Sequence, residues 1–191
     1  MTVVVSTHLD DAVFSCYSLL GPDTVVVTVL AGVPAEGVLG DWDAAGGAAS
    51  SRERVLERRA EDERALALSG ARAVHLDFLD SQYWRDGAPP ALDGLDAYLT
   101  GDVYAPAGIG NSDHVLVRDA VLAVRPDAVL YGDLPYAQRH GFGGIERELV
   151  LGDALLEEKL AASRCYATQL VQLEADFPGF LDGLGRERVS R

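Results

Sequence analysis

The chain has 191 residues, about the length of one domain, and its 48% hydrophobic content predicts an ordinary globular fold. A formal net charge of −14, from 30 acidic and 16 basic residues, argues against binding to nucleic-acid phosphates or to an anionic membrane. Cys16 and Cys165 lack CxxC spacing, and no apolar run approaches the ~20 residues of a membrane span. We therefore expect a cytoplasmic protein with a small-molecule substrate and with neither nucleic acid nor membrane as a partner; the sequence specifies no oligomeric state.

Short segments rich in Val, Leu, Tyr and Ala alternate with helix-like segments along the chain. The expected strands are 2–6, 24–30, 73–78, 102–106 and 128–131, and the expected helices are 11–20, 50–69, 91–99 and 114–124. Several of the strands are nearly continuous apolar runs, as strands covered on both faces are. The alternation predicts a Rossmann-like three-layer α/β sandwich with a mostly parallel sheet.

The helix at 50–69 has the clearest boundaries. Ser50 and Glu53 have the spacing of a capping box, in which the serine side chain accepts from the backbone N–H three residues later. Gly70 can end the helix in a left-handed conformation.

We expect a single domain over 1–191, because no linker or internal repeat interrupts the chain. The run 31–49 is rich in Gly, Ala and Asp and predicts a long loop after the second strand, either a binding loop or an ordinary surface loop. The segment 176–191 carries Pro178, glycines and several charges, so it is expected to be peripheral.

Polar and aromatic residues follow four of the expected strands. They occupy 7–11, 79–84, 108–114 and 133–136. In a parallel sheet the carboxyl ends of the strands meet at one edge, where open α/β folds bind ligands. We therefore expect these four segments to form the functional site.

Each polar residue has a structural interpretation when it is taken alone. Asp10 or Asp11 could be the N-cap of the first helix, and Asp113 could cap the helix that begins at His114. His75 lies inside an expected strand, where packing is the commoner role, and His140 lies in a turn-like segment that permits either interpretation.

The combination of His8, Asp11 and His114 favours a metal site. His8 and Asp11 are three residues apart at a strand-to-helix turn, and His114 opens a helix at the same expected edge. Two histidines and one aspartate leave the fourth position of tetrahedral Zn²⁺ open to water, as catalytic zinc sites do. The metal would lower the pKa of that water, and Asp10 would be free to take its proton.

At these residues the sequence resembles the PIG-L/LmbE-type family of zinc-dependent N-deacetylases. The similarity spans roughly 1–170, and its most specific part is the first motif, at 7–11. The matching segments are THLDD at 7–11, AVFS at 12–15, RRAED at 58–62 with Ala65 and Gly70, NSDH at 111–114, YGDLPYA at 131–137, and Lys159 with YATQ at 166–169.

The resemblance implies a role for each matching residue. His8, Asp11 and His114 would bind the metal, Zn²⁺ or another divalent ion such as Fe²⁺. Asp10 would be the general base and would later return its proton to the leaving amine. Substrates in the family are usually N-acetylated sugars or sugar conjugates, and some relatives cleave other amides.

The resemblance also implies that Arg59 reaches towards the substrate. On a helix, Arg59 shares a face with Leu56, Ala60 and Leu66 rather than with the solvent-side charges, which supports this role. An ion pair with Glu63, four residues on, is the equally weighted alternative.

One residue departs from the family pattern. Asn111 stands where the family's H-x-D-H motif has its first histidine, which Asp113 would position. Asparagine can donate a hydrogen bond to a developing oxyanion, but it supplies no positive charge and shuttles no proton. Either His140 or Tyr136 takes over this role, or activity is weakened or altered; losing one oxyanion donor costs a factor of ~10²–10³.

The first hypothesis is therefore an enzyme, a zinc-dependent amidohydrolase that removes an acetyl or similar acyl group from an amino-sugar-like small molecule or a natural-product intermediate. An alternative is a non-catalytic or altered relative that binds a small molecule, because of Asn111. A third is a metal-free α/β enzyme in which THLDD is only a capped turn. Dinucleotide binding is disfavoured because no G-x-G-x-x-G follows the first strand.

Overall fold

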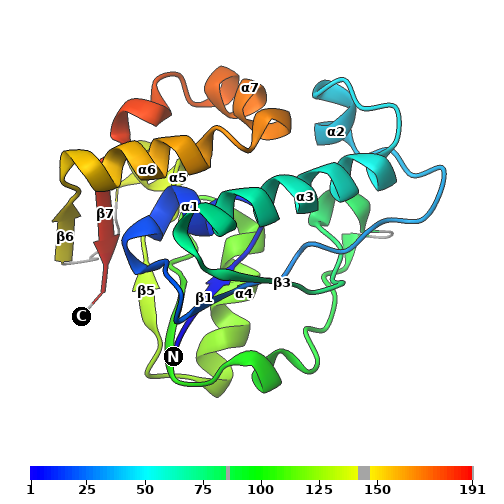
Figure 1. Ribbon diagram of the computed structural model, residues 1–191. Coiled ribbons are helices and arrows are strands. Elements are labelled where there is room, and N and C mark those ends of the chain that lie inside the picture. Colours follow the sequence, from blue (N-terminus) through cyan, green and yellow to red (C-terminus); the bar gives the residue numbers. More distant parts are fainter. Residues whose placement is uncertain (85–86, 142–146, 191) are drawn as a thin grey trace.

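A seven-stranded sheet forms the centre of the computed structural model, which describes residues 1–84, 87–141 and 147–190 (Figure 1). The strand order is β3-β2-β1-β4-β5-β7-β6. β1 to β5 are parallel, and β7 pairs antiparallel with both β5 and β6. The strands are β1 (Thr2–Ser6), β2 (Thr24–Thr28), β3 (Arg72–His75), β4 (Asp102–Pro106), β5 (Val129–Tyr131), β6 (Arg147–Val150) and β7 (Arg186–Val189). The predicted mostly parallel α/β fold is confirmed.

Helices cover both faces of this sheet. The α-helices are α1 (Asp11–Cys16), α2 (Asp41–Ala45), α3 (Ser51–Ser69), α4 (Ser112–Val124), α5 (Tyr136–His140), α6 (Asp153–Ser163) and α7 (Ala167–Asp176). Short 3₁₀ helices span Tyr17–Leu19, Ser81–Tyr83, Leu95–Tyr98 and Phe180–Gly183. The ends of α3 agree with the sequence, since Ser50 accepts from the Glu53 N–H and Gly70 has φ of 80°. None of the helices in the described ranges has both the length and the apolar character needed to cross a membrane.

Alternate residues of the central strands build two separate cores. Val3 and Val5 point to one face, where they join Val117 and Val121 of α4. Val4 points to the other face, where α1, α3, α6 and α7 contribute the apolar side chains. Figure 1 shows α4 on the opposite side of the sheet from α1, α3 and α6. Burial on both faces explains the runs of consecutive valines in β1 and β2.

The segment 176–191, predicted to be peripheral, is instead part of the fold. It supplies β7, which lies inside the sheet between β5 and β6. Phe180 and Leu184 are buried in the core. Glu187 of β7 is buried and forms an ion pair of 2.8 Å with the fully buried Lys159 of α6. One of the charges that suggested a surface segment, Glu187, is thus paired in the interior.

Several predicted elements are shorter than expected, among them the strand at 24–30, which ends at Thr28, and the helix at 11–20, whose α-helical part ends at Cys16. The strand predicted at 73–78 ends at His75. Past the end of β3, Asp77 forms an isolated antiparallel bridge with Leu30, which lies past the end of β2. The helix predicted at 91–99 is a single 3₁₀ turn, because Gly94 adopts φ of 83° directly before it. Such a left-handed residue cannot lie inside an α-helix, so the turn begins only after it.

Candidate metal and catalytic site

A cavity of about 440 Å³ opens at the carboxyl edge of the parallel strands. The segments that follow β1, β3 and β5 line it, together with the start of α4, as the sequence predicted. From these segments come His8, Asp10, Asp80, Asn111 and Tyr136. The run 31–49 also contributes, because it forms α2 and places Trp42 in the cavity wall. Of the two alternatives for this run, the position of Trp42 favours a binding loop.

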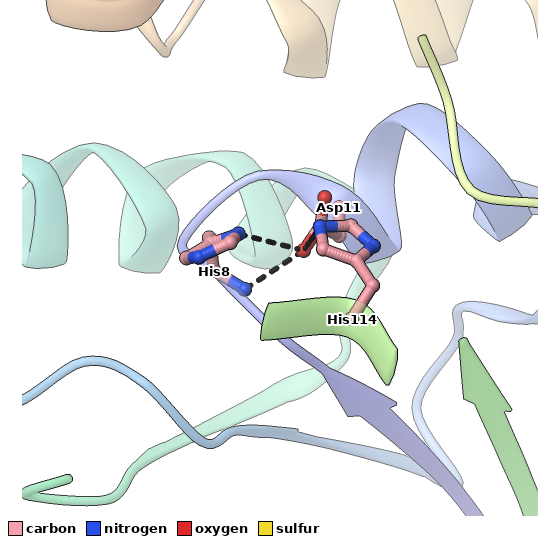
Figure 2. Close-up of side chains that lie close together, drawn as sticks. All are labelled: His8, Asp11 and His114. Atoms are coloured by element: carbon pink, nitrogen blue, oxygen red, sulfur yellow. Dashed lines mark hydrogen bonds and ion pairs between the residues drawn. The ribbon is translucent and has the colours of Figure 1, made fainter. Parts of the chain in front are cut away.

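The three predicted metal ligands lie close together at this edge, namely His8, Asp11 and His114 (Figure 2). Their ligand atoms all lie within 4.8 Å of one another. The Asp11 carboxylate is central: its Oδ2 is 3.6 Å from His8 Nδ1 and 3.5 Å from His114 Nε2, and it accepts from the His8 backbone N–H at 2.7 Å. Asp11 begins α1 and His114 lies in the first turn of α4, so two helix starts hold the group.

The outward nitrogen of each histidine ring faces a second carboxylate. His8 Nε2 is 3.3 Å from Asp113 Oδ2, and His114 Nδ1 is 3.0 Å from Asp133 Oδ1. The other oxygen of Asp133 accepts from the Ile109 backbone N–H at 2.6 Å. Carboxylates in this position keep the proton on the outward nitrogen and leave the inward lone pair free for a metal. This arrangement directs His8 Nδ1 and His114 Nε2 towards Asp11.

The donor set fits a zinc ion. His114 is fully buried, and its Nε2 has no hydrogen-bond partner among the described residues. Burial opposes ionisation of both rings, but the surrounding carboxylates outweigh it, so the pKa of His8 lies well above its ordinary value and that of His114 is also raised. A cluster that attracts protons in this way attracts a divalent cation for the same reason, and two imidazoles with one carboxylate are typical zinc ligands.

Asp10 stands beside this group without serving as a cap. It occupies the N-cap position of α1, but its side chain makes no capping hydrogen bond. It is buried and lines the cavity. Burial, reinforced by the charge of Asp11, raises the pKa of Asp10 to about 8 in the protein without a metal ion. A nearby cation lowers such a pKa, so the carboxyl group can exchange a proton near neutral pH.

Asn111 is the N-cap of α4. Its Oδ1 accepts from the Asp113 backbone N–H at 2.8 Å, so Asn111 rather than Asp113 caps this helix. Its Nδ2 donates to the Tyr136 hydroxyl oxygen at 2.8 Å. Tyr136 lines the cavity and packs edge-on against the His114 ring. Of the two groups expected to compensate for Asn111, Tyr136 is the one in place; His140 is exposed and lies against Gly110 instead.

The arginine at the cavity is Arg58, and the prediction for Arg59 is corrected by one position. Arg59 donates to Ala31 O and Asp77 Oδ1, each at 2.7 Å. Its guanidinium group therefore binds these two residues and not Glu63, and Arg59 is not among the residues that line the cavity. The prediction placed Arg59 on the inner face of the helix because its helical neighbours there are apolar. The residue of α3 that lines the cavity is instead Arg58, which is rotated by about 100° from Arg59 around the helix axis.

Arg58 itself is buried and forms an ion pair of 2.9 Å with Asp43, which also accepts from the Tyr83 hydroxyl. Its Nε and one terminal nitrogen have no hydrogen-bond partner within the described ranges. Three functional positions had not been singled out from the sequence, namely Arg58, Asp80 and Asp133. For the last two, their place directly after strands was the available signal.

The fourth histidine follows its structural interpretation. His75 Nε2 lies 2.8 Å from Asp62 Oδ2, and the other oxygen of Asp62 accepts from the Tyr166 hydroxyl at 2.8 Å. Neither residue of the pair contributes to the described cavity wall.

Comparison with solved structures gives full-length matches. A triple mutant of the deacetylase Orf2 of the teicoplanin biosynthetic pathway has 26% identity and a TM-score of 0.81 over 100% of this chain and 98% of its own. The A40926 pseudoaglycone deacetylase Dbv21 has 26% identity and a TM-score of 0.77 over 98% and 94%. The chain is therefore similar over its full length to LmbE/PIG-L-like deacetylases. These matches support the prediction of an enzyme of the N-deacetylase class. No family model and no curated protein matches the sequence.

More distant structures share the fold alone. N,N'-diacetylchitobiose deacetylase from Pyrococcus horikoshii has 16% identity and a TM-score of 0.64 over 96% of this chain and 76% of its own. The 4-carboxy-2-hydroxymuconate hydratase GalB from Pseudomonas putida has 17% identity and a TM-score of 0.65 over 99% and 94%. Because this fold also carries a hydratase, the reaction must be argued from the site. The His8, Asp11 and His114 group could hold the predicted cofactor, Zn²⁺. Among the structural neighbours, the deacetylase Orf2 was crystallised in a zinc-inhibited form.

Proposed function

We propose that this chain hydrolyses an N-acyl amide, of which N-acetyl is the simplest, on an amino-sugar-like small molecule or natural-product intermediate. His8, Asp11 and His114 hold Zn²⁺, and Asp10 is the general base. The observation that carries the proposal is the buried, unpartnered Nε2 of His114 facing Asp11, beside a buried carboxyl group that makes no capping bond. A metal-free capped turn would leave neither group in this state.

The chemistry divides between the metal and Asp10. Bound Zn²⁺ polarises the amide carbonyl and lowers the pKa of water in the cavity. Asp10 Oδ accepts the proton that this water loses when its oxygen attacks the carbonyl carbon. The same carboxyl group, now protonated, donates to the amide nitrogen as the C–N bond breaks, so that one residue is first base and then acid.

The Tyr136 hydroxyl supplies the hydrogen bond to the carbonyl oxygen. Because Asn111 Nδ2 donates to its oxygen, the hydroxyl proton of Tyr136 must point away from Asn111, and Tyr136 lines the cavity. A donor preorganised in this way stabilises the charge that develops on the carbonyl oxygen. Asn111 therefore acts by orienting Tyr136, and no histidine is required at this position.

The cavity supports the proposed substrate class. Its volume of about 440 Å³ is within the range of small-molecule sites. Trp42 and Phe177 offer aromatic surfaces, and Arg58 contributes a cationic side chain to the cavity wall. The deacetylases that share this fold act in the teicoplanin pathway, on A40926 pseudoaglycone and on N,N'-diacetylchitobiose, which are the first compounds to try.

The test uses purified protein and a panel of N-acetylated amino sugars and acylated glycopeptides. Stripping the metal should abolish amide hydrolysis, and one equivalent of Zn²⁺ should restore it. Asp10→Asn should bind zinc as wild type does but lose activity, whereas His8→Ala should lose both. Hydrolysis at the wild-type rate by His8→Ala, with zinc still bound stoichiometrically, would falsify the proposal.

The alternative is a relative that binds a small molecule but no longer hydrolyses it. Its supporting observation is that one of the two N–H groups of the Asn111 amide is already used by Tyr136, which leaves a single neutral donor where the family has a histidine. Under this alternative, Asn111→His should raise hydrolysis sharply from near zero. Under the main proposal wild type is active, and the same substitution should lower its rate because the α4 cap and the bond to Tyr136 are both lost.

A further inference from the structure

The peptide unit between Leu9 and Asp10 is held from both sides by hydrogen bonds. Its N–H group, that of Asp10, donates to His8 O at 3.0 Å, and its carbonyl oxygen, that of Leu9, accepts from Gln169 Nε2 at 2.7 Å. Because a peptide unit is planar, these two bonds fix the orientation of the whole unit, which includes the Asp10 Cα atom. The Asp10 side chain makes no capping hydrogen bond of its own, so its direction depends on this peptide.

Gln169 reaches the Leu9 carbonyl from a distant part of the chain. It lies in the first turn of α7 and is buried, and its bond to Leu9 joins α7 to the segment 7–11. A buried carbonyl oxygen that loses its donor costs free energy, so the peptide would turn to find another partner. The position of the first turn of α7 therefore controls the orientation of this peptide.

Two neighbouring carboxylates of α3 hold the start of α7 in place. The N-cap residue of α7, Tyr166, makes no side-chain capping hydrogen bond. Glu61 caps the helix instead: it is buried, and its two oxygens accept from the Thr168 backbone N–H at 3.0 Å and from the Thr168 hydroxyl at 2.7 Å. Asp62 accepts from the Tyr166 hydroxyl at 2.8 Å. A carboxylate at the start of a helix pairs with free N–H groups and is favoured by the helix dipole.

We propose that Gln169 is a positioning residue for Asp10, and that the segments RRAED at 58–62 and YATQ at 166–169 act together to place it. α3 anchors the start of α7, and α7 presents Gln169 to the Leu9 carbonyl. Without this donor the peptide can turn and carry the Asp10 carboxyl group away from the reacting water; a displacement of ~1 Å can cost a factor of ~10² in rate. The inference rests on the proposed function in taking Asp10 as the base.

The first test compares two glutamines of α7 by steady-state kinetics, with the N-acetylated amino sugar of the panel that wild type hydrolyses fastest. Gln169→Met keeps a side chain of similar length but removes the donor, and it should lower kcat by a factor of ~10² with KM and zinc content unchanged. Gln172→Met is the matched control, because Gln172 Nε2 donates to another backbone carbonyl, that of Trp42, at 2.8 Å. It loses the same kind of bond from the same helix, and its kcat should equal that of wild type.

A second pair of variants tests the link from α3 without changing the cavity wall. Thr168 is not among the residues that line the cavity, so its substitution removes no contact with a substrate. Thr168→Val removes the hydroxyl that Glu61 accepts from, and it should lower kcat less than Gln169→Met does, with KM unchanged. Thr168→Ser keeps the hydroxyl and should restore the wild-type kcat. If Gln169 only contacted the substrate, neither Thr168 variant would change kcat.

Crystal structures of wild type and Gln169→Met give a readout that needs no substrate. In the variant, the Leu9 carbonyl should turn away from α7 and the Asp10 carboxyl group should move with it. An unmoved peptide would overturn the inference, as would an unchanged kcat in Gln169→Met, an equal loss in Gln172→Met, or no difference between the two Thr168 variants.

These failures differ from failure of the proposed function. An active wild type with an equally active Gln169→Met refutes only the positioning role. A zinc-loaded wild type that hydrolyses no compound of the panel refutes the proposed function, and the two crystal structures still decide whether Gln169 holds the peptide.

Discussion

Replacing Asp10 by asparagine should remove catalysis and at the same time change how stability of the metal-free protein depends on pH. The pKa of Asp10 is raised from 3.8 to about 8, mainly by burial and then by the charge of Asp11. The folded state therefore holds a proton on Asp10 that the unfolded chain has released. Stability from this group is complete below the unfolded pKa and is lost as pH rises towards about 8.

The magnitude follows from the linkage between protons and folding. Between about pH 5 and about pH 7, the folded protein carries one more proton at Asp10 than the unfolded chain, which costs about 1.4 kcal/mol per pH unit. The free energy of unfolding of wild type should thus fall by about 2.7 kcal/mol more than that of Asp10→Asn over this interval.

Urea unfolding of chelator-treated protein at several pH values measures this difference. Asp93→Asn, which removes an exposed carboxylate, is the control and should run parallel to wild type. Parallel curves for Asp10→Asn and wild type would show that the buried carboxyl group is not protonated in the fold. In that case the argument for Asp10 as a tuned acid and base loses its electrostatic basis.

Three further outcomes are expected. Tyr136→Phe should lower kcat by a factor of ~10²–10³ with zinc content unchanged, because a donor to the developing oxyanion is lost; an unchanged kcat would assign the oxyanion to another group. Asp133→Asn should weaken zinc binding by a factor of ~10–100, measured by competition with a chelating dye, because the carboxylate facing His114 Nδ1 is lost. Lys159→Met should cost ~3–5 kcal/mol in urea unfolding, since it leaves the Glu187 carboxylate buried without its ion pair, and a cost near zero would contradict that burial.

The parallel part of the fold was predictable because its signal is local. The predicted strands 2–6 and 102–106 agree with β1 and β4 to the residue. The apolar runs in these strands indicate that both faces of the sheet are buried, and such a run can be recognised within one short segment of the sequence. β6 and β7 have the sequences RELV and RERV, whose charges hide a strand, and β7 depends on the long-range pair of Glu187 with Lys159. No pattern within one segment indicates such a partner.

The candidate site divides in the same way. The positions of His8, Asp11 and His114 follow from strand ends and helix starts, and the structure brings them together as predicted. Residues that act through others were harder to find. Asp133 contributes to the site because its carboxylate faces His114. Arg58 lines the cavity and Arg59 does not, although the two residues are adjacent on one helix. Both facts depend on tertiary geometry finer than the spacing of residues along the chain.

The place of β7 in the sheet has a consequence for how the chain is made. β6 is synthesised before β7, and among the described residues β7 is its only sheet partner; β7 also forms the link to β5. During synthesis from the amino end, β1 to β5 can assemble while the outer edge of β5 stays uncovered and β6 lacks this partner. The arrival of 186–189 closes that edge and brings the Glu187 carboxylate to Lys159.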